Sequence, residues 1–174
     1  SGDWSSDVCS SDLEGGESLI PLLKFLIDKG ADFGLEEFVL GMSHRGRLSV
    51  LANVLNKSYT QIFEEFEDVG EVEGSGDVKY HKGVQVSLKT SSGKDVEVCL
   101  PFNASHLESV NPIVEGRVRA LQELRGLPEG KKLIAPILIH GDASIAGQGV
   151  VYETLQMAKL EGYQRSEEHT SELQ

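Results

Sequence analysis

Apolar residues follow two periods along the chain, one typical of helices and one typical of strands. Leucines three and four residues apart in 17–29, followed by Gly30, indicate a helix and its end. Asn111, with Pro112 in the first turn, is expected to cap another helix. The predicted helices are 17–29, 47–55, 58–66 (capped by Ser58) and 111–124.

Four short apolar segments have the length and composition of strands. Residues 84–88 and 96–100 alternate apolar and polar side chains, and Ser91-Ser92-Gly93-Lys94 between them is typical of a hairpin. Residues 38–40 and 133–139 are continuous apolar runs, as in buried strands. Helices and strands mingle around one inserted hairpin, so the sequence predicts an α/β fold with a largely parallel sheet flanked by helices.

The composition fits one globular domain. The chain has 174 residues, of which 39% are hydrophobic and 25% charged, and no apolar run approaches the roughly 20 residues of a membrane helix. A net charge of −12 argues against a nucleic-acid partner, because phosphates attract Lys and Arg. The two cysteines, Cys9 and Cys99, form neither a disulfide framework nor a zinc motif.

The two ends differ in composition from the middle. Residues 1–13 are rich in Ser and Asp, and 165–174 are similarly polar, without any hydrophobic period. Both resemble translated sequencing-adapter read-through; the alternative is a pair of natural disordered tails. The expected folded unit is therefore 14–164.

The turn Gly141-Asp142-Ala143-Ser144 follows the predicted strand 133–139 and opens a glycine-punctuated helix. In open α/β sheets, ligands gather beyond the carboxyl ends of strands. Asp142 offers a hard oxygen ligand for Mg²⁺, and the backbone N–H groups of Ala143 and Ser144 suit a phosphate. The structural alternative is that Asp142 caps the helix and the later glycines relieve a tight turn.

The segment after strand 38–40 brings a histidine and two arginines to a second strand–helix junction. Arg45 and Arg47 suit a two-pronged contact with phosphate or carboxylate. His44 can exchange protons near neutral pH. The structural alternative is that His44 caps the helix and Arg47 lies on its solvated face.

Three further histidines lie near loops. His106 belongs to the polar loop 102–108, which is placed to converge on a bound acid, or it is a hydrogen-bonded structural residue. His140 directly precedes the Gly-Asp turn and is expected to support it. His81 borders the acidic, glycine-rich loop 68–77 and is expected at the surface.

Four sequence blocks occur together in a fixed order: GMSHRGRLSVLANVLNK, GSGDVKYHKG, PFNASHLESVNPIVEGRVRA and IHGDASIAGQGVVYETLQMAK. In combination they resemble the thiamine-diphosphate-dependent decarboxylating component of the 2-oxoglutarate dehydrogenase complex. The resemblance covers about 14–164 and implies a thiamine-diphosphate-binding fold, specifically part of its diphosphate-binding domain.

The resemblance implies a cofactor site. Asp142 would bind Mg²⁺, while Ala143 and Ser144 would approach the diphosphate of thiamine diphosphate and Arg45 would contact it. Gly-Asp-Ala stands where the wider group of thiamine enzymes has Gly-Asp-Gly, as is usual in this branch.

The resemblance also implies a reaction. His44 and His106 would recognise the 2-oxo acid and assist its decarboxylation, with the thiamine ring as electron sink. The substrate would be 2-oxoglutarate, and the succinyl product would pass to the lipoyl arm of the dihydrolipoyl succinyltransferase component. The full-length protein would be a homodimer.

Part of the family's thiamine site is expected to be missing from this chain. The paired Asn residues that follow Asp142 in the family, and the later pyrimidine-binding domain, are not in the sequence. The 174-residue chain by itself is therefore expected to be inactive. Alternatives are an enzyme acting on 2-oxoadipate, or a non-catalytic module that binds phosphate or magnesium. The expected compartment is the bacterial cytoplasm, or the mitochondrial matrix if the source is a eukaryote.

Overall fold

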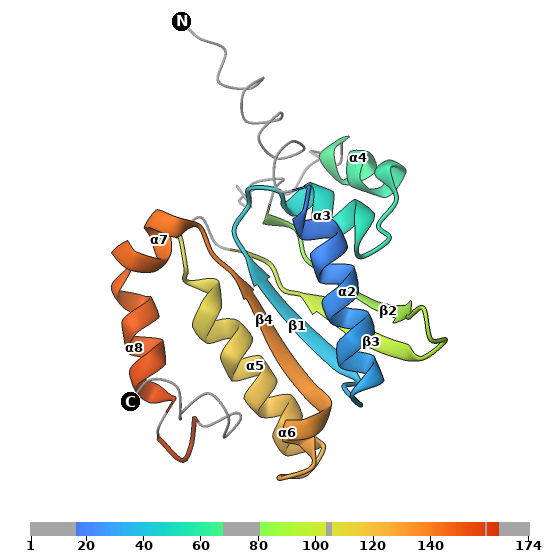
Figure 1. Ribbon diagram of the computed structural model, residues 1–174. Coiled ribbons are helices and arrows are strands. Elements are labelled where there is room, and N and C mark those ends of the chain that lie inside the picture. The colour runs from blue at the N-terminus through green and yellow to red at the C-terminus, as the bar shows by residue number, and fades with distance from the viewer. Residues whose placement is uncertain (1–16, 68–80, 104–105, 159, 164–174) are drawn as a thin grey trace, which may run out of the picture.

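The protein is an α/β structure built on a four-stranded sheet (Figure 1). The computed structural model describes residues 17–67, 81–103, 106–158 and 160–163. The strands are β1 (Glu37–Met42), β2 (Val84–Lys89), β3 (Asp95–Leu100) and β4 (Ile134–Ile139). The helices are α2 (Leu19–Asp32), α3 (Arg47–Asn53), α4 (Tyr59–Glu67), α5 (Val110–Leu124), α6 (Gly130–Leu133), α7 (Asp142–Gly147) and α8 (Gly149–Met157).

The sheet has the order β2-β3-β1-β4 and is largely parallel. β1 pairs in parallel with both β3 and β4, and β2 pairs antiparallel with β3 as the predicted hairpin. The α/β class and the predicted helices and strands are confirmed within a few residues at their ends. The parallel pairs join segments far apart in sequence, as expected when crossover helices separate the strands.

Helices cover both faces of the sheet because the side chains of β1 alternate between two apolar clusters. Phe38 and Leu40 pack with residues of α2 and α3, whereas Val39 packs with valines of α5. Gly41 lets α5 approach closely, since a Cβ there would lie 2.9 Å from Val114 Cγ2. Figure 1 shows α8 beside α5, at one end of the molecule.

Three expectations for helix boundaries were wrong, and one was confirmed. Helix α2 does not end at Gly30 but continues to Asp32. Asn111 does not cap α5: it lies inside the helix, is buried, and its side chain donates to Glu108. The short helix α6 lies directly before β4, where no helix was predicted. Ser58 does cap α4, because its Oγ accepts the backbone N–H of Gln61 at 3.1 Å.

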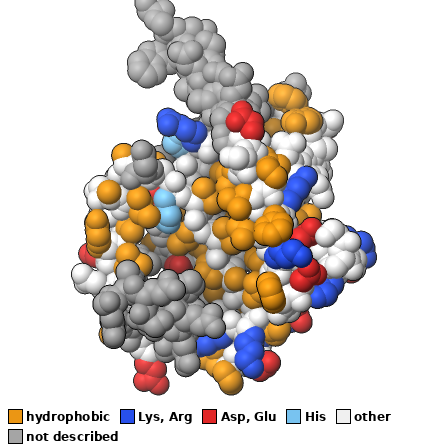
Figure 2. All heavy atoms as spheres, in the orientation of Figure 1, with side chains coloured by type: hydrophobic (Ala, Val, Ile, Leu, Met, Phe, Trp, Pro, Cys, Tyr) orange, Lys and Arg blue, Asp and Glu red, His pale blue; other side chains and the backbone are white. Residues whose placement is uncertain are grey.

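The expected tails, 1–13 and 165–174, and the acidic loop 68–77 lie outside the described residues. Within the described part, Cys99 is buried and forms no disulfide. No helix there is long and apolar enough to cross a membrane. Leu22, Phe25 and Leu26 are exposed on the outer side of α2, where Figure 2 shows hydrophobic side chains gathered.

Candidate functional site at one edge of the sheet

Four loops meet at one edge of the sheet. The parallel register aligns Met42 with Ile139, so the connections after β1 and β4 leave the sheet side by side. β3 is parallel to β1, so the connection after Leu100 leaves at the same edge. β2 runs the other way, and its first residue, Val84, lies opposite Leu100. The segment before β2 therefore joins the edge, and all four sequence blocks send residues to it.

The loop after β1 carries the first pair of candidate residues. Gly46, with φ 75°, adopts the left-handed conformation directly before α3. His44 is half-buried. Arg45 is exposed, so a ligand can reach its side chain. Arg45 thus has the accessibility that its predicted contact with an anion requires.

His81 lies beside His44, with ring centroids 6.2 Å apart. The expectation that His81 lies at the surface was wrong, because only 5% of the residue is exposed. Its carbonyl accepts the backbone N–H of Asn103 at 3.1 Å, which ties the segment before β2 to the segment after β3. In a hairpin that pairs Val84 with Leu100, the residues before Val84 must lie near those after Leu100. The hairpin predicted from the sequence therefore already implied that His81 lies near Asn103.

Arg47 is the most buried charged side chain of the described part, with an exposed fraction of 0%. Its guanidinium donates to the carbonyls of Lys82 at 2.7 Å, of Met42 at 3.2 Å and of Pro101. Burial lowers the pKa of this guanidinium to about 10, so it stays charged at neutral pH. The alternative that Arg47 lies on a solvated helix face is therefore wrong, and the guanidinium meets backbone carbonyls rather than the phosphate or carboxylate that the sequence also suggested. It ties together three of the four loops.

The Gly-Asp turn follows β4 as predicted. Gly141 has an extended backbone and precedes α7, which begins at Asp142. Ala143 is exposed and Ser144 is half-buried, while the structure does not describe the side chain of Asp142. A Cβ on Gly141 would lie 3.2 Å from Ser144 Oγ, so the turn is compact. No group of three or more His, Cys, Asp or Glu side chains forms a metal site among the described residues.

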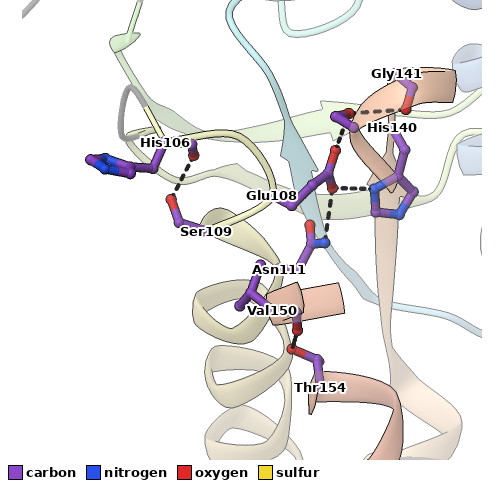
Figure 3. Close-up of polar contacts among 9 residues, drawn as sticks. His106, Glu108, Ser109, Asn111, His140, Gly141, Val150 and Thr154 are labelled. Carbon is purple, nitrogen blue, oxygen red and sulfur yellow. Dashed lines mark hydrogen bonds and ion pairs between the residues drawn. The ribbon is translucent and has the colours of Figure 1, made fainter. Parts of the chain in front are cut away.

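Glu108 is a site residue that the sequence did not single out (Figure 3). Its carboxylate is buried and adjoins three side chains from α5, the end of β4 and α7. Asn111 Nδ2 donates to Oε2 at 2.9 Å, Ser144 Oγ lies 2.6 Å from Oε1, and His140 Nδ1 lies 2.5 Å from Oε2. No local signal reveals this role, because two of the partners lie 32 and 36 positions away.

The charge of Glu108 is stabilised in place. Burial raises the pKa of its carboxyl group, but the hydrogen bond from Ser144 and the two others lower it by more, to below the ordinary value of 4.5. An ionised carboxylate only accepts hydrogen bonds, so His140 Nδ1 is the donor in this contact. The expectation that His140 supports the Gly-Asp turn is consistent with this contact.

His106 lies apart from these contacts. The residue is exposed, and its ring points away from Glu108 and His140 in Figure 3. Its backbone carbonyl accepts the hydroxyl of Ser109 at 2.8 Å, directly before α5. The structure thus brings His44 next to His81. The ring of His106 is exposed on another loop, the one that follows β3.

The chain is similar to known proteins over most of its length. The family described as "Dehydrogenase E1 component" matches residues 21–165. The chain belongs to this family. It is 51% identical over 152 residues to the 2-oxoglutarate dehydrogenase E1 component of Azotobacter vinelandii, and 53% identical over 156 residues to the mitochondrial 2-oxoglutarate dehydrogenase of Dictyostelium discoideum.

A third relative, the mitochondrial 2-oxoglutarate dehydrogenase-like protein of Xenopus laevis, is 50% identical over 163 residues. The matches cover 87%, 87% and 92% of this chain but only 16%, 15% and 16% of the respective relatives. The chain thus spans about one sixth of the length of the curated relatives it matches.

Proposed function

We propose that this chain is the diphosphate-binding part of a first component of the 2-oxoglutarate dehydrogenase complex. The observation that supports it most is the parallel register of β1 and β4, which brings the His44–Arg45 loop beside the Gly141–Ser144 turn. These are the two sequence blocks whose residues would grip a diphosphate. In open α/β sheets, this edge is where ligands bind.

The residues at the edge fit thiamine diphosphate and Mg²⁺. Asp142 supplies the kind of oxygen ligand that Mg²⁺ prefers, and Arg45 is exposed on the loop after the neighbouring strand, where it could meet phosphate oxygens. The compact turn at Gly141 and the exposed residue Ala143 leave room for a diphosphate to approach the backbone of Ala143 and Ser144. Bound there, the cofactor would supply the electron sink for loss of carbon dioxide.

The protein's own contribution to the reaction is binding and orientation. His44 and His81 form a pair of imidazoles at the edge, and imidazole N–H groups are suitable donors to a substrate carboxylate. We propose His81 for this role together with His44, and His106 as a further contact from the open side of the loop. The substrate is 2-oxoglutarate in this proposal.

The full-length protein would oxidatively decarboxylate 2-oxoglutarate and pass the succinyl group to the lipoyl arm of the succinyltransferase component. It would act as a homodimer, in the bacterial cytoplasm or in the mitochondrial matrix. Two of the relatives carry "mitochondrial" in their names, and another is from the bacterium Azotobacter vinelandii.

A chimera tests this proposal. Residues 14–164 replace the matching segment of the Azotobacter vinelandii protein, and Mg²⁺-dependent binding of thiamine diphosphate is measured by calorimetry. We expect Asp142→Asn to weaken binding by about 100-fold or more, since even loss of an outer-shell partner costs about 10- to 100-fold. Asp32→Asn, an exposed change at the end of α2, should leave binding unchanged.

The same chimera distinguishes substrates. A higher kcat/KM with 2-oxoglutarate than with 2-oxoadipate supports the proposal, and the reverse order contradicts it. If the chimera bound inorganic phosphate as tightly as thiamine diphosphate, a non-catalytic phosphate-binding module would be the better description.

A further inference from the structure

Glu108 combines two features that are costly unless something offsets them. Its φ is 66°, in the left-handed region that non-glycine residues rarely adopt, and its carboxylate is buried. Each feature costs free energy of folding. The surrounding contacts must therefore hold the residue in place.

The contacts connect Glu108 to the Gly-Asp turn rather than only to its own helix. Asn111 is the local partner, three positions away on α5. His140 and Ser144 flank Asp142 by two residues on either side, and both reach the same carboxylate (Figure 3). The turn is therefore held at both ends by one side chain from another loop.

The hydroxyl of Ser144 is committed to this contact. It has one proton and lies 2.6 Å from Glu108 Oε1 and 2.9 Å from the carbonyl of Gly141. The carboxylate is the closer and stronger acceptor, so the proton points to Glu108. Any contact of Ser144 with a diphosphate must then come through its backbone.

We propose that Glu108 is a positioning residue that fixes the backbone of the Gly141–Ser144 turn in the shape that receives the diphosphate. The value of this role for cofactor binding depends on the proposed function, whereas the positioning itself does not. The alternative is a local structural role, in which Glu108 only stabilises the start of α5 through Asn111. That alternative predicts no local effect on the turn.

The first test measures the turn directly by hydrogen–deuterium exchange of the 174-residue chain. In α7, the N–H of Ile145 donates to Gly141 and that of Gln148 donates to Ser144. We expect Glu108→Gln, which keeps the size but removes the charge, to speed exchange of these amides about tenfold, as for a loss of roughly 1.4 kcal/mol of local protection. Ser144→Ala, a milder change, should speed it less.

A matched control separates this effect from general loss of stability. Glu115 lies on the same α5 and is as buried as Glu108, at 8% exposure of each residue. Glu115→Gln should leave exchange in the turn as it is in the unmodified chain. The proposal is overturned if Glu108→Gln leaves the turn unchanged, or if Glu115→Gln speeds its exchange equally.

The second test measures cofactor affinity in the Azotobacter chimera. Glu108→Gln should weaken binding of thiamine diphosphate with Mg²⁺ by about tenfold or more, while the KM for 2-oxoglutarate changes less than about twofold. Equal losses in both would contradict a role confined to the turn. If the unmodified chimera does not bind thiamine diphosphate but exchange still responds to Glu108→Gln, the positioning role stands and the proposed function fails.

Discussion

Two buried charged residues organise the loops of the candidate site in opposite ways. The Arg47 network consists of one guanidinium and the backbone carbonyls of three loop segments. The Glu108 network consists of one carboxylate and the side chains of Asn111, His140 and Ser144. The first depends on the identity of a single residue, because every residue type has a carbonyl. The second depends on four.

The difference also bears on charge. The carbonyls that meet Arg47 are neutral, and so are the amide of Asn111 and the hydroxyl of Ser144 that meet Glu108. These contacts therefore stabilise each buried charge by hydrogen bonding without neutralising it.

The largest expected effect is the loss of the Arg47 network. Arg47→Met should lower the free energy of unfolding by about 3 kcal/mol or more, because three carbonyls, one buried and two part-buried, lose a charged donor. Urea unfolding of the 174-residue chain measures this. Lys82→Met is the control: it changes a side chain whose backbone alone takes part, and should cost less than about 0.5 kcal/mol. Equal losses of unfolding free energy in the two variants would contradict the prediction that the network depends on the side chain of Arg47 alone.

The next effect is loss of the Glu108 network. Glu108→Ala should cost about 1–3 kcal/mol, and His140→Ala or Ser144→Ala about 0.5–1.5 kcal/mol each. Unlike the Arg47 network, each partner's side chain should matter. Urea unfolding with Ser109→Ala as a neighbouring control checks this, since the hydroxyl of Ser109 donates to the carbonyl of His106 and not to Glu108.

The Glu108 contribution should also depend on pH with a defined sign. The pKa of the folded carboxyl lies below 4.5, so the ionised form stabilises the fold above that pH, and the stabilisation is lost as the pH falls below it. The difference in unfolding free energy between the unmodified chain and Glu108→Gln should shrink from about pH 6 to about pH 3. A difference that grows towards low pH would contradict the assignment.

A smaller effect is expected at the glycine beside the Arg47 network. Gly46→Ala should cost about 1–2 kcal/mol, purely from the left-handed backbone, because a Cβ there meets nothing within 4 Å. Gly116→Ala is the control with the opposite sign: the site is open and helical, so stability should rise by about 0.5–1 kcal/mol. Thermal unfolding of both variants tests whether the left-handed backbone is the reason why a glycine occupies position 46.

The smallest expected effect is the coupling between the two networks. They share no partner residue, so the costs of Arg47→Lys and Glu108→Gln should add to within about 0.5 kcal/mol in a double-mutant cycle. A coupling above about 1 kcal/mol would show that the loops respond as one unit.

The sequence predicted the positions of candidate residues better than their partners. The order of elements placed the His44–Arg45 loop and the Gly-Asp turn after parallel strands, and the structure has them side by side. Burial was misjudged for His81 and Arg47, because polarity predicts exposure unless the partners are known. Those partners lie on other loops, up to 54 positions away in sequence for Arg47.

Asn111 shows the same limit on a smaller scale. An Asn before Pro is a common helix-start signal, and the sequence predicted it as the cap of α5. In the structure, helix α5 begins one residue earlier at Val110, and Asn111 donates to Glu108 from inside it. The sequence did not identify Glu108 as the acceptor, because the position of its carboxylate depends on contacts with α7 and the end of β4.

By itself, the sequence determined the α/β class, the helices and strands in their order, and the blocks that identify the family, because these depend on local periodicity and on residue patterns along one stretch of chain. The tertiary structure alone decided that His81 meets His44, that Arg47 is buried against three carbonyls, and that Glu108 holds the Gly-Asp turn. The reason is physical: burial and hydrogen-bond partnership are properties of segments brought together by the parallel sheet, and no local period records which segments those will be.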